Sequence, residues 1–551
     1  MSTTPDTAST DTGGIDTGLA ADDLAIGTMK MVKVDGHRVC VARTADGLHA
    51  IDHACPHEGY GLTQGELNDG VVTCAWHNWK FRVTDGVCVQ GEEDVTAHPV
   101  TVAADGGVRV TINRPDPEFL RPRLVASLRS GIERNYGGQV SRDVVRLLQA
   151  SANPGELIWE AIAHGAPRAE FGWGHSIASA TDCLAMVELY EGDQRALPIV
   201  QGIMGIAESE RGRPVNPLPE PARSDASTAV AFRTAVEAEQ IAEAQSYVLA
   251  AIERGDDADV LRPWFTSVVG DHHLSYGHGA IYSQKAFELL DMLGWDRAAT
   301  VLPHLVPTLV YGTREDKLPY MRPFMKALAD VDLAALAEAH VDSGWQDDGR
   351  LLAALLGDDR TAPVTATAAA LRDGAGVDGV LGAVVEAVSR RMLRYDVSGE
   401  FDFADDFGWL DITHGLTYAN AARWHVARAP SGPTPDLLRL VLFTAFLAQW
   451  TGRHEWHTSI GDPAEMVPLA ENRVAYGEEL QRQSLLDGTT AFIVHAHAVK
   501  TSRAAAIEAE QSGSMLPLDA TARFLAAPKL ERFVAATVKR SIDFLNGKVP
   551  R

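Results

Sequence analysis

The sequence predicts a multidomain protein in which a small all-β domain precedes a large all-α domain. A chain of 551 residues exceeds what one hydrophobic core usually supports, so two or more domains are expected. The first part contains short β-rich runs separated by Asp-Gly pairs, a pattern typical of strands and tight hairpin turns. The longer second part is rich in Ala and Leu, with apolar residues three and four positions apart, which is typical of helices.

Local composition sets the boundaries of these parts. Residues 1–22 are rich in Ser, Thr, Asp and Gly, and we expect a disordered tail because such a segment buries too little apolar surface. Residues 23–113, with runs such as MKMVKV and VRVTIN, form the predicted β domain. Residues 114–122, RPDPEFLRP, carry three prolines and are the predicted linker. Residues 123–551 form the predicted helical domain, which includes segments such as LLRLVLFTAFLAQWTG.

Net charge and cysteine content indicate which partners are disfavoured and in which compartment the protein is expected. The formal net charge of −25 at pH 7 argues against nucleic acid and anionic membrane surfaces, because both would repel the protein. No apolar run reaches transmembrane length, and the first residues lack the charged and apolar regions of a signal peptide. The five Cys show no pairing pattern, as expected where thiols stay reduced. We therefore expect a cytoplasmic protein without disulfides.

One stretch, CPHEGYGLTQGELNDGVVTCAWHNWKF, contains two Cys and two His in two similar loops. Cys55 lies two residues before His57, and Cys74 lies three residues before His77. A zinc site is one alternative, but a zinc finger usually presents its two Cys together and its two His together. One Cys and one His from each loop suit a [2Fe-2S] cluster instead, with both Cys on one iron and both His on the other.

This stretch resembles the Rieske ferredoxin family, and the resemblance covers about residues 23–113. The shared features are C-P-H, a Gly-containing spacer of sixteen residues, C-A-W-H-N-W-K-F and a hairpin turn at Asp85-Gly86. The resemblance implies that all four Cys and His residues bind a [2Fe-2S] cluster. Such a module carries single electrons, so an external electron donor, a separate reductase, is an expected partner.

A departure from one branch of that family indicates the type of domain. High-potential Rieske proteins of respiratory chains carry an extra Cys pair that bridges the two cluster loops. Tyr60 and Trp76 occupy the corresponding places in this sequence. The domain is therefore similar to the low-potential type that is associated with oxygenases.

The helical part contains several His-rich segments that predict a second metal site. Four segments begin with a His that is followed four residues later by a hydroxyl residue, and residues four apart share a helical face. Neutral imidazoles with a carboxylate form the ligand set of non-haem iron. The alternative for any single His is an N-cap or core residue, and a mononuclear or a dinuclear site remains open. The candidate ligands of this second site are His175, His273, His278, His414, His495, His497, Asp271 and Asp411.

We expect the catalytic residues among these segments. His278, His414 and His497 are the first choices as ligands, and Tyr282 and Tyr418 follow two of them by four residues. Trp residues near the same segments have a size that suits a pocket for an organic substrate, although plain core packing is the simpler explanation for each of them.

Two comparisons bear on the chemistry of the helical part. His273 and His278 have the spacing of the His pair that binds catalytic iron in Rieske oxygenases, but five residues turn a helix by about 140°, so Gly277 would have to break it. The oxygenase catalytic domain is built on a large antiparallel sheet, and the sequence after residue 123 shows no such strands. Stretches such as HHLSYGHGAIY and ITHGLTYANAARW resemble questin-oxidase-like proteins, which are helical oxygenases.

A Gly-rich segment offers an alternative cofactor. GAGVDG, residues 374–379, matches the dinucleotide fingerprint G-x-G-x-x-G, but the strand that should precede it is missing, so a helix connection is the simpler interpretation. No other nucleotide or flavin motif is found in the sequence. Electrons are therefore expected from a separate protein.

The sequence thus favours a Rieske-fused non-haem iron oxygenase. In this interpretation the [2Fe-2S] cluster passes electrons to a His-ligated iron centre, which activates O2 to oxidise a small organic substrate as a mono- or dioxygenase. The alternative is a Rieske-type electron-transfer protein whose helical domain only docks partners. Homo-oligomerisation is compatible with either function.

Overall fold

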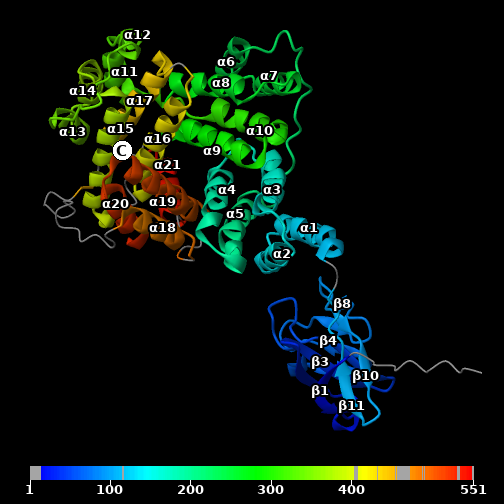
Figure 1. Cartoon of the computed structure of the whole chain (residues 1–551). Helices are drawn as coiled ribbons and strands as arrows, with labels where there is room; N and C mark the ends of the chain where they lie inside the picture. The colour runs from blue at the N-terminus through cyan, green and yellow to red at the C-terminus, as the bar shows by residue number, and fades with distance from the viewer. Residues whose placement is uncertain are drawn as a thin grey trace, which may run out of the picture. The chain divides into compact units, whose positions relative to one another are not determined.

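The computed structural model describes residues 14–114, 117–401, 407–430, 432–452, 454–455, 472–486, 488, 491–529 and 534–548. Contacts divide the chain into two units, Met1–Ser127 and Leu128–Arg551. The fold class predicted from the sequence is confirmed, because antiparallel strands come first and helices follow (Figure 1).

The β unit consists of three small antiparallel sheets. Their strand orders are β1-β11-β10, β2-β3-β4-β9 and β5-β6-β7-β8. The strands are β1 (Ile15–Ala20), β2 (Met29–Val34), β3 (His37–Thr44), β4 (Gly47–Asp52), β5 (Glu66–Asn68), β6 (Val71–Thr73), β7 (Lys80–Arg82), β8 (Cys88–Gln90), β9 (Ala97–His98), β10 (Val100–Val102) and β11 (Gly107–Val110).

Asp-Gly turns set the register of two hairpins. Asp35 and Gly36 both have positive φ, of 46° and 79°, and Val34 pairs with His37 across them. The pair at 69–70 likewise joins β5 to β6 with φ values of 49° and 73°. Positive φ at both central residues is the type I′ geometry that matches the twist of neighbouring strands. These two turns are as the sequence predicts.

The first strand corrects one boundary of the sequence analysis. β1 pairs with β11, with Ile15 opposite Val110 and Asp16 opposite Arg109. The expectation of a disordered tail up to residue 22 is therefore wrong for Ile15–Ala20. Residues 1–13 of that tail lie outside the described residues. The strand is hard to foresee from local composition, because its partner lies some ninety residues further along the chain.

The second unit is helical throughout its described parts. The first helix begins at Pro117, inside the segment expected to be a linker. The helices are α1 (Pro117–Glu133), α2 (Gly137–Gln149), α3 (Pro154–Gly165), α4 (His175–Met186), α5 (Ala196–Ser209), α6 (Ala229–Glu237), α7 (Ile241–Arg254), α8 (Ala258–Asp271), α9 (His278–Leu293), α10 (Ala298–Tyr311), α11 (Arg322–Ala329), α12 (Leu333–Ala337), α13 (Arg350–Leu356), α14 (Ala362–Arg372), α15 (Gly376–Arg394), α16 (Trp409–Ala427), α17 (Pro435–Trp450), α18 (Arg473–Ser484), α19 (Phe492–Ser512), α20 (Leu516–Ala526) and α21 (Val534–Leu545).

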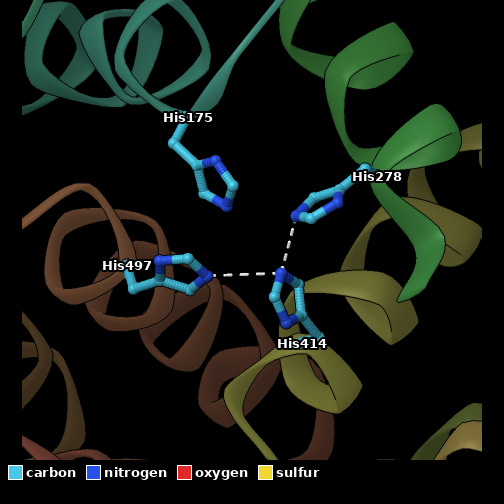
Figure 2. Close-up of side chains that lie close together, drawn as sticks. All are labelled: His175, His278, His414 and His497. Atoms are coloured by element: carbon cyan, nitrogen blue, oxygen red, sulfur yellow. Dashed lines mark hydrogen bonds between the residues drawn. The ribbon is translucent and has the colours of Figure 1, made fainter. Parts of the chain in front are cut away.

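Four helices that are distant in sequence form a ring. α4 packs against α9 and α19, and α16 packs against the same two helices. Each of the four carries one of the His residues of the predicted second site. The ring therefore brings these side chains to a common centre (Figure 2).

The Gly-rich segment 374–379 connects two helices. Its first two residues link α14 to α15, its last four begin α15, and Gly374 and Gly376 have positive φ of 98° and 60°. A helix rather than a strand precedes it, so the helix-connection interpretation is the one that the fold supports. Within the described ranges, no helix combines the length and the apolar composition that a membrane crossing requires.

Candidate metal centres

Two loops of the β unit bring together the predicted cluster ligands. Cys55 and His57 follow β4, and Cys74 and His77 lie between β6 and β7. The two loops have the same turn, because the Cys55 amide donates to the Tyr60 carbonyl and the Cys74 amide donates to the Trp79 carbonyl, both at 2.8 Å. Equivalent turns place equivalent side chains opposite one another.

The ligand atoms in these loops fit a cluster with two unlike irons. The Nδ1 atoms of His57 and His77 lie 2.9 Å apart, and His77 is exposed. Cys55 and Cys74 are only 2% and 3% exposed. Burial, together with the neighbouring Cys74, raises the pKa of the Cys55 thiol to about 12. Buried thiols of this kind bind as thiolates only beside a strong positive charge, which the irons of a [2Fe-2S] cluster supply.

Aromatic rings support the two loops. Tyr60 and Trp76 stack with ring centroids 4.8 Å apart, so they link the loops where the sequence comparison places an extra Cys pair in other Rieske proteins. Trp79 stacks on the imidazole of His57 at 4.9 Å. Glu58, which the sequence analysis did not single out, groups with His57 and His77 at the exposed side.

Comparison with known proteins agrees with this geometry. The family model of the Rieske [2Fe-2S] domain matches residues 18–102. These residues form a Rieske [2Fe-2S] domain. The Rieske domain is 38% identical over 79 residues to the ferredoxin component of an alkene monooxygenase system of Xanthobacter autotrophicus, which covers 13% of this chain and 65% of the relative. A 4beta-methylsterol monooxygenase of Methylococcus capsulatus is 39% identical over 54 residues, or 10% of this chain and 15% of the relative.

A solved structure aligns with the same small share of the chain. The ferredoxin of carbazole 1,9a-dioxygenase from Nocardioides aromaticivorans IC177 is 25% identical, covers 18% of this chain and 98% of its own, and has a TM-score of 0.17. The alkene monooxygenase ferredoxin and the methylsterol monooxygenase are each matched over less than two thirds of their own length. These relatives therefore bear on the Rieske domain and not on the helical unit.

In the helical unit, four His side chains form a second group. One nitrogen from each of His175, His278, His414 and His497 lies within 4.8 Å of the others, and the four rings point toward one centre (Figure 2). The Nε2 atom of His414 is 2.7 Å from that of His278 and 3.2 Å from that of His497. These four residues are the four-His site.

Two of the four His lie at the start of a helix, and the other two lie inside a helix. His175 and His278 are the first residues of α4 and α9, whereas His414 and His497 are each the sixth residue of α16 and α19. All four His begin similar segments in the sequence, but only those of the first pair begin a helix. The first pair stays partly exposed, and the second pair is buried.

Electrostatics keep these imidazoles neutral. Burial lowers the pKa of all four, that of His414 to about 3, and the nearby Lys500 lowers each of them as well. The Nδ1 atom of His497 lies 2.8 Å from the carbonyl of Ile493, so Nδ1–H donates there and the lone pair of Nε2 faces the other imidazoles. Neutral imidazoles with converging lone pairs are metal ligands.

The spacing of the nitrogens suits a single ion. With metal–nitrogen bonds of about 2.1 Å, two ligand nitrogens lie about 3 Å apart when adjacent and about 4.2 Å apart when opposite. Two of the observed separations are 2.7 Å and 3.2 Å, and all four nitrogens lie within 4.8 Å of one another. The four-His site therefore fits one divalent metal ion, and imidazole ligands suit iron, zinc, copper and nickel.

The other candidate ligands of the second site lie elsewhere. His273 is fully buried against the rings of Tyr418, Phe443 and Phe446, and its Nε2 is 3.4 Å from a carboxylate oxygen of Glu315. No continuous helix joins His273 to His278, because α8 ends at Asp271 and Gly277, with φ of +89°, precedes the start of α9. The two His nevertheless lie in different surroundings. The structure does not bring them together as a ligand pair.

Both predicted carboxylates have other partners. Asp271 forms ion pairs with Arg233 and Arg439. Asp411 accepts a hydrogen bond of 2.9 Å from the amide of Gly408 and so caps the start of α16. The prediction of either as the carboxylate ligand is not supported by this geometry. His495, two residues before His497 on α19, is likewise outside the four-His site, because residues two apart lie on nearly opposite helical faces.

The two candidate catalytic tyrosines differ in position. The ring of Tyr282 stacks on His278 at 5.0 Å and lies 5.8 Å from His175, so it belongs to the wall of the four-His site. Tyr418 packs on His273 at 5.3 Å, although it follows His414 by one turn. Of the two tyrosines, only Tyr282 has a ring contact with the four-His site among the described residues.

The sequence analysis missed three buried charged residues on the helices that carry the four-His site. Asp182 and Lys285 follow His175 and His278 by seven residues, or two helical turns, and are paired at 2.9 Å. Lys500 follows His497 by three residues, is 2% exposed, and lies with its Nζ 5.5 Å from the Tyr282 ring. Burial lowers the pKa of Lys500 to about 7. A charged residue on the apolar face of a His-bearing helix was the available signal.

Proposed function

We propose that the chain is a Rieske-fused non-haem iron oxygenase in which the four-His site binds the catalytic metal. The observation that carries the proposal is the convergence of four neutral imidazoles from four helices on one point. Such a site sits on the same chain as a Rieske [2Fe-2S] domain. We propose iron because a one-electron donor has no use beside zinc, which has no redox chemistry.

Each part of the chain has a separate task in this proposal. Cys55, His57, Cys74 and His77 would hold the cluster, which supplies single electrons that arrive from a separate reductase. The four-His site would hold the iron, which supplies a place where O2 and substrate meet and receive those electrons.

The protein side chains set the conditions around that iron. The hydrogen bond from His497 to the Ile493 carbonyl fixes the ring, so that Nε2 faces the metal position. Four protein nitrogens leave open positions on an ion that accepts six ligands, and the partial exposure of His175 and His278 marks the side from which small molecules reach them. Tyr282 covers the apolar wall beside His278 and excludes water there.

The relatives agree with this class of function at a coarse level. The names of the two curated relatives describe an electron carrier of a monooxygenase system and a sterol monooxygenase. The two matches cover 13% and 10% of the present chain. Oxidoreductase activity, with O2 and a small organic molecule as substrates, is the function that we extend to the whole protein.

The experiment compares reoxidation of the Rieske cluster in two proteins. The cluster is reduced with dithionite without oxygen and mixed with O2-saturated buffer, and its visible absorbance is followed. In the wild type, we expect reoxidation to be faster by roughly tenfold or more than in the His414→Ala, His497→Ala double variant, because only the wild type offers electrons a second metal. The control is His164→Ala, which changes a His on α3 outside the site.

Equal rates in all three proteins would favour the alternative function, an electron carrier whose helical domain docks partners. A slow double variant that has also lost its cluster absorbance before reduction would indicate misfolding, so the oxidised spectra of all proteins are recorded first. Retained cluster absorbance with slow reoxidation supports the oxygenase.

A further inference from the structure

The described charged groups at the four-His site are positive, and no negative ligand balances them. The group of converging ligand atoms consists of four imidazoles, and no carboxylate of the described residues belongs to it. Asp271 and Asp411 have other partners. A divalent ion in this site would therefore keep its full positive charge.

Lys500 adds to this charge without a partner of its own. Its Nζ is buried and makes no hydrogen bond or ion pair with any residue in the described part of the chain. Asp182 attracts this ammonium group, but its carboxylate is already paired with Lys285 at 2.9 Å and with Arg503 at 3.3 Å. A buried ammonium group without a counter-charge is costly, and such a group is retained where a ligand completes it.

Lys500 also lies next to the metal position. It is on the same helix as His497, three residues on, and therefore on the same face. Its Nζ is 5.5 Å from the centroid of the Tyr282 ring, which in turn stacks on His278 at 5.0 Å. Tyr282 is thus a common neighbour of the lysine and of the four-His site.

Two helix starts add further positive potential. α4 and α9 begin at His175 and His278, and neither has a side chain that accepts a hydrogen bond from its first amides. Elsewhere in the unit, Asp257 and Thr434 cap the starts of α8 and α17 in that way. Uncapped amides at a helix start favour a negatively charged ligand.

We propose that the substrate is a small organic anion whose charged oxygen, a phenolate, enolate or carboxylate, binds between the metal and the ammonium group of Lys500. This inference rests on the proposed function, because it requires a metal in the four-His site. The anion supplies the negative charge that the described ligands lack, and it gives Lys500 a charge-assisted hydrogen bond. Lys500 would thereby select acidic substrates over neutral ones of the same shape.

The test uses the full-length, iron-loaded protein and calorimetric titration without oxygen. The probes are 4-nitrocatechol as a phenolate, benzoate as a carboxylate and 1-methylimidazole as a neutral metal ligand. In the Lys500→Met variant, we expect affinity for at least one anionic probe to fall by roughly 10- to 100-fold, the effect of losing a hydrogen bond to a charged group. Affinity for 1-methylimidazole should stay within about twofold.

The Lys500→Arg variant keeps the charge and should retain more of the anion affinity than Lys500→Met does. Equal affinities of wild type and Lys500→Met for both anions, or an equal loss for the neutral probe, would overturn the role of Lys500. A wild-type protein that binds no iron at the four-His site would instead refute the proposed function itself. If Lys500→Met does not fold, the affinities of wild type and Lys500→Arg for the three probes are compared instead. A difference for the anionic probes alone would support the anion contact of Lys500, because only such a contact distinguishes anions from the neutral probe.

Discussion

Replacing Lys500 with Met should stabilise the helical unit, whereas the same replacement of Lys285 should destabilise it. Both lysines are almost completely buried, at 2% and 4% exposure, and both belong to the ring of helices that surrounds the four-His site. Their partners differ. Lys285 pairs with Asp182 and with Glu288, each at 2.9 Å, while Nζ of Lys500 has no hydrogen-bond partner among the described residues.

The magnitudes follow from these contacts. Removing Lys285 leaves buried carboxylates short of a cation, which typically costs about 3–5 kcal/mol. Burial lowers the pKa of Lys500 from 10.5 to about 7. Each pKa unit corresponds to about 1.4 kcal/mol, so the ammonium group of Lys500 costs about 4 kcal/mol near pH 7. Methionine of similar length recovers part of this cost, and we expect a gain of about 1–4 kcal/mol in the free energy of unfolding.

The pH dependence has a definite sign. The pKa of Lys500 is lower in the folded chain than in the unfolded chain, so the unfolded chain binds more protons between about pH 7 and pH 10.5. The destabilisation by the Lys500 ammonium group is therefore complete below pH 7 and decreases as the pH rises, because the lysine loses its proton in the folded chain. The advantage of Lys500→Met over the wild type should therefore shrink between pH 7 and pH 10.

The assay is urea unfolding of chelator-treated protein, followed by far-ultraviolet circular dichroism, since the helices lie in the second unit. The three proteins, wild type and the two Lys→Met variants, are compared at pH 7 and pH 9. Loss of stability in Lys500→Met as large as that in Lys285→Met would refute the reasoning, because it would mean that Lys500 has a stabilising partner.

Three further changes test other parts of the structure. Gly277→Ala should cost more stability than Gly255→Ala, although both residues have φ near +90°. A Cβ at position 277 would meet an aromatic ring at 2.5 Å, whereas a Cβ at position 255 would meet nothing within 4 Å. Thermal unfolding of the two variants measures the difference, and equal losses would contradict this account of the packing. Glu315→Gln should raise the free energy of unfolding by about 3 kcal/mol over the wild type at pH 8 and by little at pH 4. Burial raises the pKa of Glu315 from 4.5 to about 7, so the wild type loses stability as the pH rises through that interval and the variant does not. A pH-independent difference would exclude this explanation. Trp76→Ala should speed the loss of cluster absorbance in chelator by roughly 2- to 10-fold, because it removes the stack on Tyr60 that links the two loops; an unchanged rate would show that the stack does not hold the loops.

The cluster ligands were predictable because they lie in two short loops with local geometry. Cys55 and His57 are held by one turn, and the same turn recurs at Cys74 and His77, so the spacing in the sequence carries most of the information. Strand β1 was not predictable in this way. Its pairing depends on β11, and residues 15–20 have no strong local β pattern.

The four-His site was predictable only in part, because its ligands meet through tertiary packing. In the sequence, His175, His278, His414 and His497 share a hydroxyl residue four positions later, and these are the four that meet. The sequence did not rank His175 above His273 and His495 as the fourth ligand. Asp271 was misleading, since the two Arg residues that pair with it come from distant helices. Lys500 was missed for the converse reason, because the absence of a partner is visible only in three dimensions.

The most direct test of the central claim is the ratio of total iron to acid-labile sulfide in protein purified without oxygen. Sulfide reports the [2Fe-2S] cluster alone. We predict one iron per chain in excess of sulfide in the wild type and in the His164→Ala control, and no excess in the His414→Ala, His497→Ala double variant with sulfide unchanged. Equal iron and sulfide in the wild type, or an excess that persists in the double variant, would contradict a metal in the four-His site.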